Sequence, residues 1–182
     1  MGTVTTLPRG RALTRRDLDT MPDDGHRYEL IDGTLVVTPA PSEQHQVIVV
    51  ELTVVLHRAC PRDMRVLVAP FDVALSDDTV MQPDLLVARR ADFTERHLPV
   101  APALAVEVLS PSTRHVDLSL KRARFESAGV PSYWVVDPAG PSLTVWELDQ
   151  GRYVERAHVA ADEEYAATAP FPVTITPALL LD

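Results

Sequence analysis

Two carboxylates lie in segments whose other residues are almost all apolar. Glu107 interrupts the run 103–109, and Asp84 follows Pro83 in the run 80–87. Continuous apolar runs are typical of central strands covered on both faces, where an ionised side chain must be paired or bind a metal. Since side chains alternate along a strand, neighbouring strands would let Asp84 and Glu107 converge. The pair predicts an oxygen-rich cation site, because one or two carboxylates, with water and substrate phosphate, commonly hold Mg²⁺.

Each carboxylate also has a purely structural interpretation. In it, Asp84 ends a strand directly after Pro83, and Glu107 pairs with a buried arginine. For one carboxylate taken alone this interpretation is favoured. Two carboxylates on successive strands favour a functional site.

The chain contains a single lysine among its 17 basic residues, Lys121. On the helix predicted over residues 116–128, an apolar stripe is formed by Leu118, Phe125 and Ala128. At about 100° per residue, Lys121 falls within that stripe. A lysine in this position either extends its stem until the amine meets water or reaches a buried anionic site, and the sequence weights the two equally.

Turn and cap residues organise the segment before these strands. Asp32-Gly33 between two apolar, β-prone runs predicts a hairpin over residues 27–37. Ser42 is the expected N-cap of a four-turn helix with an apolar stripe. That stripe contains His45, Ile48, Val49, Leu52, Val55, Leu56 and Ala59. On such a stripe His45 is more typical of a hydrogen-bonded core histidine than of a metal ligand.

The remaining elements complete a mixed architecture. Strands are predicted over 65–75, 80–88 and 103–109, followed by the helix over 116–128 and further strands from residue 133 onward. We expect residues 1–12 to form a flexible tail and residues 13–182 to form one domain. The order of elements predicts an α/β or α+β fold with a mixed central β-sheet flanked by helices.

Composition excludes several classes of protein. The 182 residues are 46% hydrophobic and 24% charged, which excludes a wholly disordered chain. A single cysteine, Cys60, excludes an intrachain disulfide. No apolar run reaches the roughly 18 residues that cross a bilayer, so we expect a cytoplasmic protein without a membrane partner. The net charge of −9 argues against a protein that coats nucleic acid, whereas a nucleic-acid enzyme with local positive charge and metal ions remains compatible.

The segments around these residues resemble the PD-(D/E)XK nuclease superfamily. The motifs that carry the resemblance are QPD at residues 82–84 and VEVLSPST at 106–113. YELIDG at 28–33 and GVPSYWVVDP at 129–138 make the chain more closely similar to the Uma-type branch, which is assigned to bacterial restriction endonucleases. The similarity extends over about residues 14–148 and implies a restriction-endonuclease-like core.

The resemblance implies a Mg²⁺-dependent endonuclease that hydrolyses phosphodiester bonds of DNA, with Mn²⁺ as a substitute. Asp84 and Glu107 would hold the metal, with the Val108 carbonyl as a further ligand. Lys121 would orient or activate water and offset charge on the scissile phosphate. Glu29 matches the family's first acidic position and is expected to hold a metal-bound water. A solvent-facing hairpin carboxylate at Glu29 is equally compatible with the sequence.

One position departs from the superfamily pattern. The signature places a lysine two residues after the second acid, on the same face of the strand, and Leu109 stands there instead. The branch's Asp-x-x-x-Lys pattern, matched by Asp117 and Lys121, implies that the lysine has moved to the following helix.

The residues that follow the second acid are candidates for contacts with the nucleic-acid backbone. Ser112, Thr113, Arg114 and Arg122 are the expected phosphate-binding residues, with His115 and Arg124 nearby. For the arginines the alternative is a solvated helix face, which is favoured for Arg124.

Two further expectations concern partners and the alternative class of function. Cutting both strands needs two active sites, so a homodimer is expected. The alternative function is a non-catalytic module that binds nucleic acid or protein on a nuclease fold. It is favoured by the net charge and the missing strand lysine and disfavoured by the retained Asp84, Glu107 and Lys121.

Overall fold

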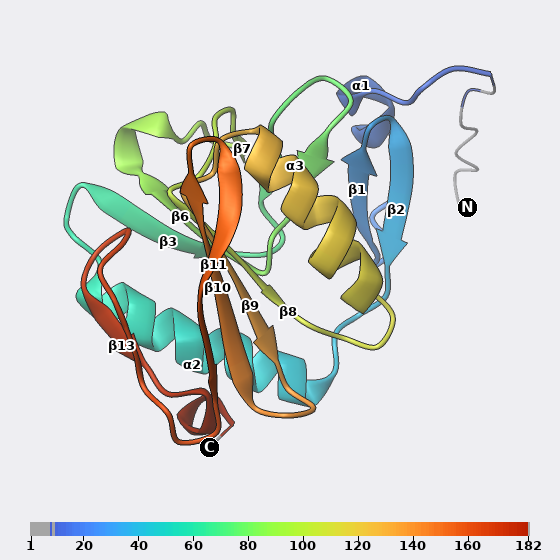
Figure 1. The fold of residues 1–182 in the computed structure, drawn as a ribbon. Coiled ribbons are helices and arrows are strands. Elements are labelled where there is room, and N and C mark those ends of the chain that lie inside the picture. Colours follow the sequence, from blue (N-terminus) through green and yellow to red (C-terminus); the bar gives the residue numbers. More distant parts are fainter. Residues whose placement is uncertain (1–7, 9, 182) are drawn as a thin grey trace.

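Six strands form the larger sheet of the computed structural model, which describes residue 8 and residues 10–181 (Figure 1). Their order is β11-β10-β9-β8-β6-β3. The strands are β3 (Met64–Val68), β6 (Leu85–Arg89), β8 (Leu104–Val108), β9 (Ser132–Asp137), β10 (Ser142–Asp149) and β11 (Arg152–Ala160). β8 and β9 run parallel, and the other neighbouring pairs run antiparallel. The predicted mixed sheet is therefore present.

A second sheet of five short strands packs beside the first, in the order β2-β1-β5-β4-β7. Its strands are β1 (Arg27–Ile31), β2 (Thr34–Thr38), β4 (Asp72–Ala74), β5 (Val80–Met81) and β7 (His97–Leu98). Asp32 and Gly33 join β1 to β2 with positive φ angles of 52° and 70°, as a two-residue hairpin turn requires. The predicted hairpin is confirmed.

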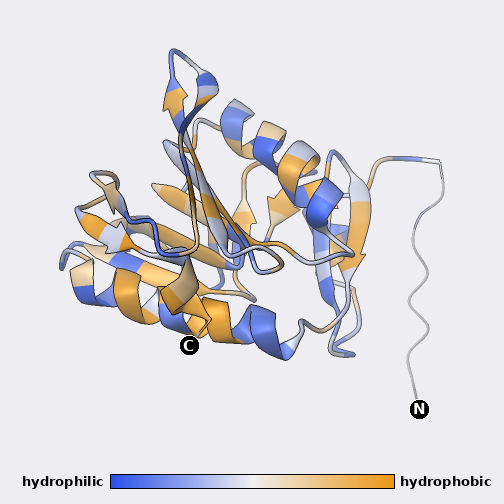
Figure 2. Cartoon of the chain, turned by 60° about the horizontal axis from the view of Figure 1, so that its bottom comes forward, coloured by the Kyte–Doolittle hydropathy of each residue, from blue (hydrophilic) through white to orange (hydrophobic). Residues whose placement is uncertain are grey.

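Helices cover both faces of the six-stranded sheet (Figure 1). α2 (Glu43–Ala59) begins after Ser42, whose hydroxyl accepts a hydrogen bond from the His45 amide at 3.3 Å. Figure 2 shows its first turn as hydrophilic and its middle as hydrophobic, and that middle packs on one face of the sheet. A π-helical segment (Val116–Lys121) and α3 (Arg122–Ser127) lie on the other face. The sequence predicted a regular helix here, and the structure shows wider π turns over its first half.

The remaining elements are short. They are α1 (Arg15–Leu18), 3₁₀ turns at Arg90–Asp92 and Pro177–Leu180, and a two-stranded sheet of β12 (Tyr165–Ala167) and β13 (Val173–Ile175). Most of the predicted tail falls on residues 1–7 and 9, which lie outside the described residues, while Arg11 forms an ion pair with Asp17 at 2.7 Å. Within the part of the chain that the structure describes, no helix is long and apolar enough to cross a membrane.

Two predicted strands are each divided between the two sheets, which corrects the sequence-based boundaries. The run 65–75 becomes β3 and β4, and the run 80–88 becomes β5 and β6. Pro70 and Pro83 lie at the two breaks, where a residue without an N–H cannot continue the ladder. Asp84 therefore does not lie within a strand, as the alternation argument assumed, but one residue before β6, where the chain crosses between the sheets.

Candidate active site

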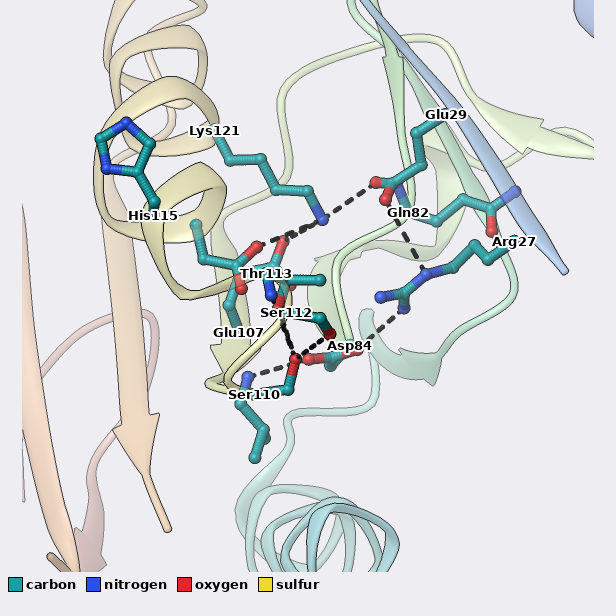
Figure 3. Close-up of polar contacts among 12 residues, drawn as sticks. Arg27, Glu29, Gln82, Asp84, Glu107, Ser110, Ser112, Thr113, His115 and Lys121 are labelled. Atoms are coloured by element: carbon teal, nitrogen blue, oxygen red, sulfur yellow. Dashed lines mark hydrogen bonds and ion pairs between the residues drawn. The ribbon is translucent and has the colours of Figure 1, made fainter. Parts of the chain in front are cut away.

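The amine of Lys121 contacts three carboxylates, and Figure 3 shows it pointing toward two of them, those of Glu29 and Glu107. Its Nζ is 3.0 Å from Oε1 of Glu29, 3.1 Å from Oε1 of Glu107 and 3.7 Å from Oδ1 of Asp117. The four residues are only 0–2% exposed to solvent. Lys121 therefore reaches a buried anionic site, and Glu29 is not a solvent-facing hairpin residue.

Local structure brings these side chains together from three elements. Glu107 alternates with Val106 and Val108, which face α2, so its own side chain faces the opposite helix. Asp117, Lys121 and Phe125 follow at intervals of four residues and form the buried face of that helix.

Glu29 comes from the other sheet. It lies on β1, whose neighbour β5 ends just before Gln82, and the Gln82 amide donates a hydrogen bond to Oε1 of Glu29 at 2.7 Å. This bond fixes the carboxylate at the junction between the two sheets.

Asp84 lies next to this cluster and accepts three hydrogen bonds. Arg27 Nη1 donates to Oδ1 at 2.8 Å, while Oδ2 lies 3.0 Å from His45 Nε2 and accepts from the Val108 amide at 2.8 Å. Leu85 pairs with Val106, and the same register continued by one residue places Asp84 beside Glu107. The strands that carry the two acids are thus neighbours, although Asp84 reaches the site from a crossover.

The pKa values of Asp84 and Lys121 both shift in the direction that favours the charged form. Burial disfavours the charged form of Asp84, but the hydrogen bond from His45 and the charge of Arg27 outweigh it and hold its pKa well below the usual range. Burial likewise opposes the charged form of Lys121. The charges of Glu107, Glu29 and Asp117 outweigh that effect and raise the pKa of Lys121, so its amine stays protonated.

The pKa values of Glu107 and Asp117 shift toward the neutral form. Burial raises the pKa of Glu107 well above its usual value, because the charge of Lys121 opposes it only in part and the nearby Asp117, Asp84 and Glu29 add to the rise. Burial raises the pKa of Asp117 in the same way. Three carboxylates surround one ammonium group, so the positive charge of Lys121 is fully balanced. The negative charges of the three carboxylates are balanced only in part.

The cluster therefore carries more negative than positive charge when it is fully ionised. Glu29, Asp84, Glu107 and Asp117 face two permanent cations, Arg27 and Lys121. Two buried oxygens, Oε2 of Glu29 and Oε1 of Gln82, have no hydrogen-bond partner. Excess negative charge and free oxygen donors fit a hard divalent cation.

The geometry limits how such a cation would be held. Among the described residues, no group of three or more His, Cys, Asp or Glu side chains is arranged to hold a metal ion by itself. A cation here would therefore rely on one or two carboxylates together with water or substrate oxygens, which is the usual arrangement for Mg²⁺.

A cavity of about 720 Å³ opens beside Asp84. Arg27, His45 and Gln82 line it together with Asp84, whereas Glu107 and Lys121 lie behind this wall. Ser112 and Thr113 also line it, and both hydroxyls lie within 3.0 Å of the Ser110 hydroxyl. The buried cluster thus meets solvent through Asp84.

The predicted phosphate-binding residues separate into two groups. Ser112 and Thr113 face the cavity, as described above. Arg114 instead donates to Asp137 at 2.6 Å, and the Arg122 guanidinium lies 5.1 Å from the ring centre of Trp146. Arg124 pairs with Asp32, and His115 points away from the cluster (Figure 3).

Sequence reasoning missed Arg27 and the role of His45 as a partner of Asp84. A signal for Arg27 exists, because it stands two residues before Glu29 on a strand and so shares its face. The sequence predicts a hydrogen-bonded core histidine at position 45, and the structure shows one, but its partner Asp84 is 39 positions away in sequence.

The family model for Uma2, described as "Putative restriction endonuclease", matches residues 15–180. The chain belongs to the Uma2 family. The resemblance drawn from the motifs at residues 28–33, 82–84, 106–113 and 129–138 is confirmed by this match. Among curated proteins, none matches this chain.

The solved structures include a relative of this Uma2 protein. It is described as a putative nuclease belonging to DUF820 from Anabaena variabilis ATCC 29413, and its TM-score is 0.71 at 19% sequence identity. The match covers 93% of this chain and 97% of the other. At this identity the similarity shows a common fold, and the expected nuclease-like α+β core is confirmed.

Proposed function

We propose that this Uma2 protein is a divalent-metal-dependent endonuclease that hydrolyses phosphodiester bonds of DNA. The observation that carries the proposal is the buried cluster of four carboxylates and two cations that meets the cavity at Asp84. A structural ion pair needs one acid for each base, whereas this cluster keeps an excess of acids in a place where their burial is costly. Membership of a family described as restriction endonucleases agrees with this function.

Asp84 and Glu107 are the proposed ligands of Mg²⁺, or of Mn²⁺ in its place, with the Val108 carbonyl as a further ligand. A bound divalent cation would neutralise charge on a phosphate and lower the pKa of bound water. His45 and the Val108 amide hold the Asp84 carboxylate in a fixed orientation. Glu29 is proposed to orient a water through Oε2, which accepts no hydrogen bond from the described residues.

Lys121 supplies positive charge rather than acting as a base, because its raised pKa keeps it protonated. Its contacts with Glu29 and Glu107 fix both carboxylates and reduce their mutual repulsion. In this proposal a lysine on the helix performs the role that the superfamily signature gives to a lysine on the strand.

The substrate phosphate is proposed to lie in the cavity between Asp84 and the start of the helix. The hydroxyls of Ser112 and Thr113 can donate hydrogen bonds to its oxygens, and the exposed Arg114 can bind the next phosphate along the strand. Arg122 is already engaged with Trp146, so the proposal leaves it out. Two copies of the chain, arranged as a symmetric dimer, would present two such sites to the two strands of a duplex.

The alternative is a binding module without catalytic activity. It is favoured by one observation, that Arg27, His45 and the Val108 amide already occupy both oxygens of Asp84. If these contacts are permanent, Asp84 has little capacity left for a metal.

Cleavage and metal binding separate the two functions. The protein is incubated with supercoiled, linear and single-stranded DNA in the presence of Mg²⁺, Mn²⁺ or chelator. The variant Asp84→Asn is assayed in parallel, and Asp149→Asn, at an exposed position, is the control. Nuclease activity predicts nicking that needs the metal, disappears in Asp84→Asn and persists in Asp149→Asn. Calorimetry that detects no Mg²⁺ or Mn²⁺ binding, together with absent cleavage, would support the binding module instead.

A further inference from the structure

A second, smaller cavity of about 430 Å³ lies where α2 ends and β3 begins. Its lining residues are His57, Cys60, Pro61, Arg62, Arg65, Val66, Leu67 and Arg90. α2 is 17 residues long, so this cavity is about 25 Å from the first turn of the helix, which lines the larger cavity beside Asp84. The smaller cavity is therefore separate from the candidate active site.

The two cavities differ in charge. Three arginines and no carboxylate line the smaller one, whereas one arginine and four aspartates, Asp19, Asp23, Asp72 and Asp84, line the larger one. This local positive charge occurs in a chain whose net charge is −9. Because three arginines and no carboxylate line this one cavity, its charge favours an anionic ligand.

Contacts with neighbouring groups orient two of these guanidinium groups, those of Arg65 and Arg90, without neutralising them. Arg90 Nε donates to the carbonyl of Arg62 at 2.8 Å, and the Arg65 guanidinium lies 5.7 Å from the ring centre of Phe93. None of Arg62, Arg65 and Arg90 forms an ion pair with a carboxylate in the described part of the chain. The exposed arginines of β11 behave differently, since Arg152 pairs with Glu126 and Arg156 with Glu147 and Asp149.

We propose that this arginine pocket, defined by Arg62, Arg65 and Arg90, binds phosphate groups. The guanidinium group presents a planar fork of donors that matches phosphate oxygens, and it stays charged at every physiological pH. The phosphates come either from a nucleic-acid backbone or from a free polyphosphate, because both present the same oxygens. This site needs neither the carboxylate cluster nor a metal, so it extends beyond the proposed nuclease activity.

The test measures binding in chelator, where metal-dependent cleavage cannot occur. Wild type is compared with Arg62→Gln/Arg65→Gln, and with Arg152→Gln/Arg156→Gln, which removes the same charge from a surface where acids already neutralise it. One probe is a fluorescein-labelled DNA duplex of about 20 base pairs, followed by anisotropy at several salt concentrations. The other is inorganic tripolyphosphate, followed by calorimetry.

For a backbone site, the salt dependence of DNA binding is the decisive measurement. Each phosphate contact contributes about 0.9 to the slope of log K against log salt, so Arg62→Gln/Arg65→Gln should flatten the slope by about 2 and the control by much less. For a free polyphosphate, the same variant should weaken tripolyphosphate binding by about tenfold or more and leave DNA binding unchanged. Either result supports the proposal and identifies the source of the phosphate.

The proposal is overturned if both double variants change binding of each probe to the same extent, or if wild type binds neither probe. Circular dichroism checks the fold, and Arg90→Gln replaces the double variant if that variant does not fold. Asp84→Asn should bind both probes at the arginine pocket as wild type does. Failure of the nuclease proposal would therefore appear as absent cleavage, while failure of the arginine pocket would appear as unchanged salt dependence of DNA binding together with unchanged tripolyphosphate binding.

Discussion

The Lys121 amine lies 3.1 Å from the Glu107 carboxylate. Lys121 stands on the helix, 14 residues after Glu107 in the chain. Leu109 occupies the strand position where the superfamily signature has its lysine. The long side chain of Lys121 therefore places an ammonium group beside Glu107, although it comes from the helix and not from the strand.

Lys121→Met should lower both stability and cleavage. The change keeps the aliphatic stem but leaves Glu29, Glu107 and Asp117 without their shared cation, and uncompensated buried charge costs about 3–5 kcal/mol of unfolding free energy. Cleavage of DNA should fall by about two orders of magnitude. Urea denaturation in chelator and a plasmid-nicking assay measure the two effects. Arg122→Met, which removes a cation that contacts Trp146, should leave nicking within a few-fold of wild type.

Asp84→Asn should abolish cleavage and also destabilise the fold. The environment of Asp84 favours its charge, because Arg27 and the hydrogen bond from His45 hold its pKa low. An amide cannot pair with Arg27, and it presents a donor where Oδ1 or Oδ2 now accepts a hydrogen bond. Thermal unfolding of the two proteins in chelator gives the comparison. An unchanged melting temperature would show that the contacts seen around Asp84 contribute nothing to stability.

His45→Asn should reduce cleavage while Asp84 remains in place. His45 Nε2 lies 3.0 Å from Asp84 Oδ2 and holds one side of that carboxylate, so its loss should weaken metal affinity or activity by about 10–100-fold. His57→Asn, on the exposed face of the last turn of the same helix, is the matched control. Metal titration by calorimetry distinguishes an effect on metal affinity from an effect on substrate. Equal activity of the two variants would exclude a positioning role for His45.

Asp17→Asn should destabilise the protein at neutral pH more than in acid. Hydrogen bonds from Arg11 and from the Thr14 amide lower the pKa of Asp17 in the folded state. A depressed folded-state pKa adds stability above the unfolded pKa of about 3.9, and this contribution is lost as the pH falls toward the folded-state pKa. The difference in melting temperature between wild type and variant should therefore shrink below about pH 4. A difference that is constant from pH 7 to pH 3 would contradict this account.

Features with local causes could be predicted from the sequence. The Asp32-Gly33 turn and the Ser42 cap depend on a few adjacent residues, and the structure contains both. Helical periodicity places Lys121 on the inward face of its helix, but it left open whether the amine reaches water or the buried anionic site that the structure shows.

Features that depend on distant contacts could not be predicted. Alternation treats residues 80–88 as one strand, but Pro83 and the pairing of β5 and β6 in different sheets divide it. Arg27 contacts Asp84 across 57 positions of sequence, and no local pattern encodes that distance. Single residues such as Asp84 and Lys121 could be singled out from the sequence. The residues that neutralise their charges could be identified only from the three-dimensional structure.

The position of the carboxylate cluster between two sheets affects how the protein folds. Arg27 and Glu29 come from the five-stranded sheet, whereas Glu107 lies on the six-stranded sheet and Lys121 on the helix that covers it. Contacts between segments so far apart in sequence form late, since the chain must first lose the entropy of closing a long loop. The charged residues from the two sheets therefore meet only when the sheets dock. Before the sheets dock, the acids and bases of the cluster would be unpaired. A newly made chain would therefore form the cluster and reach its full stability in the same step.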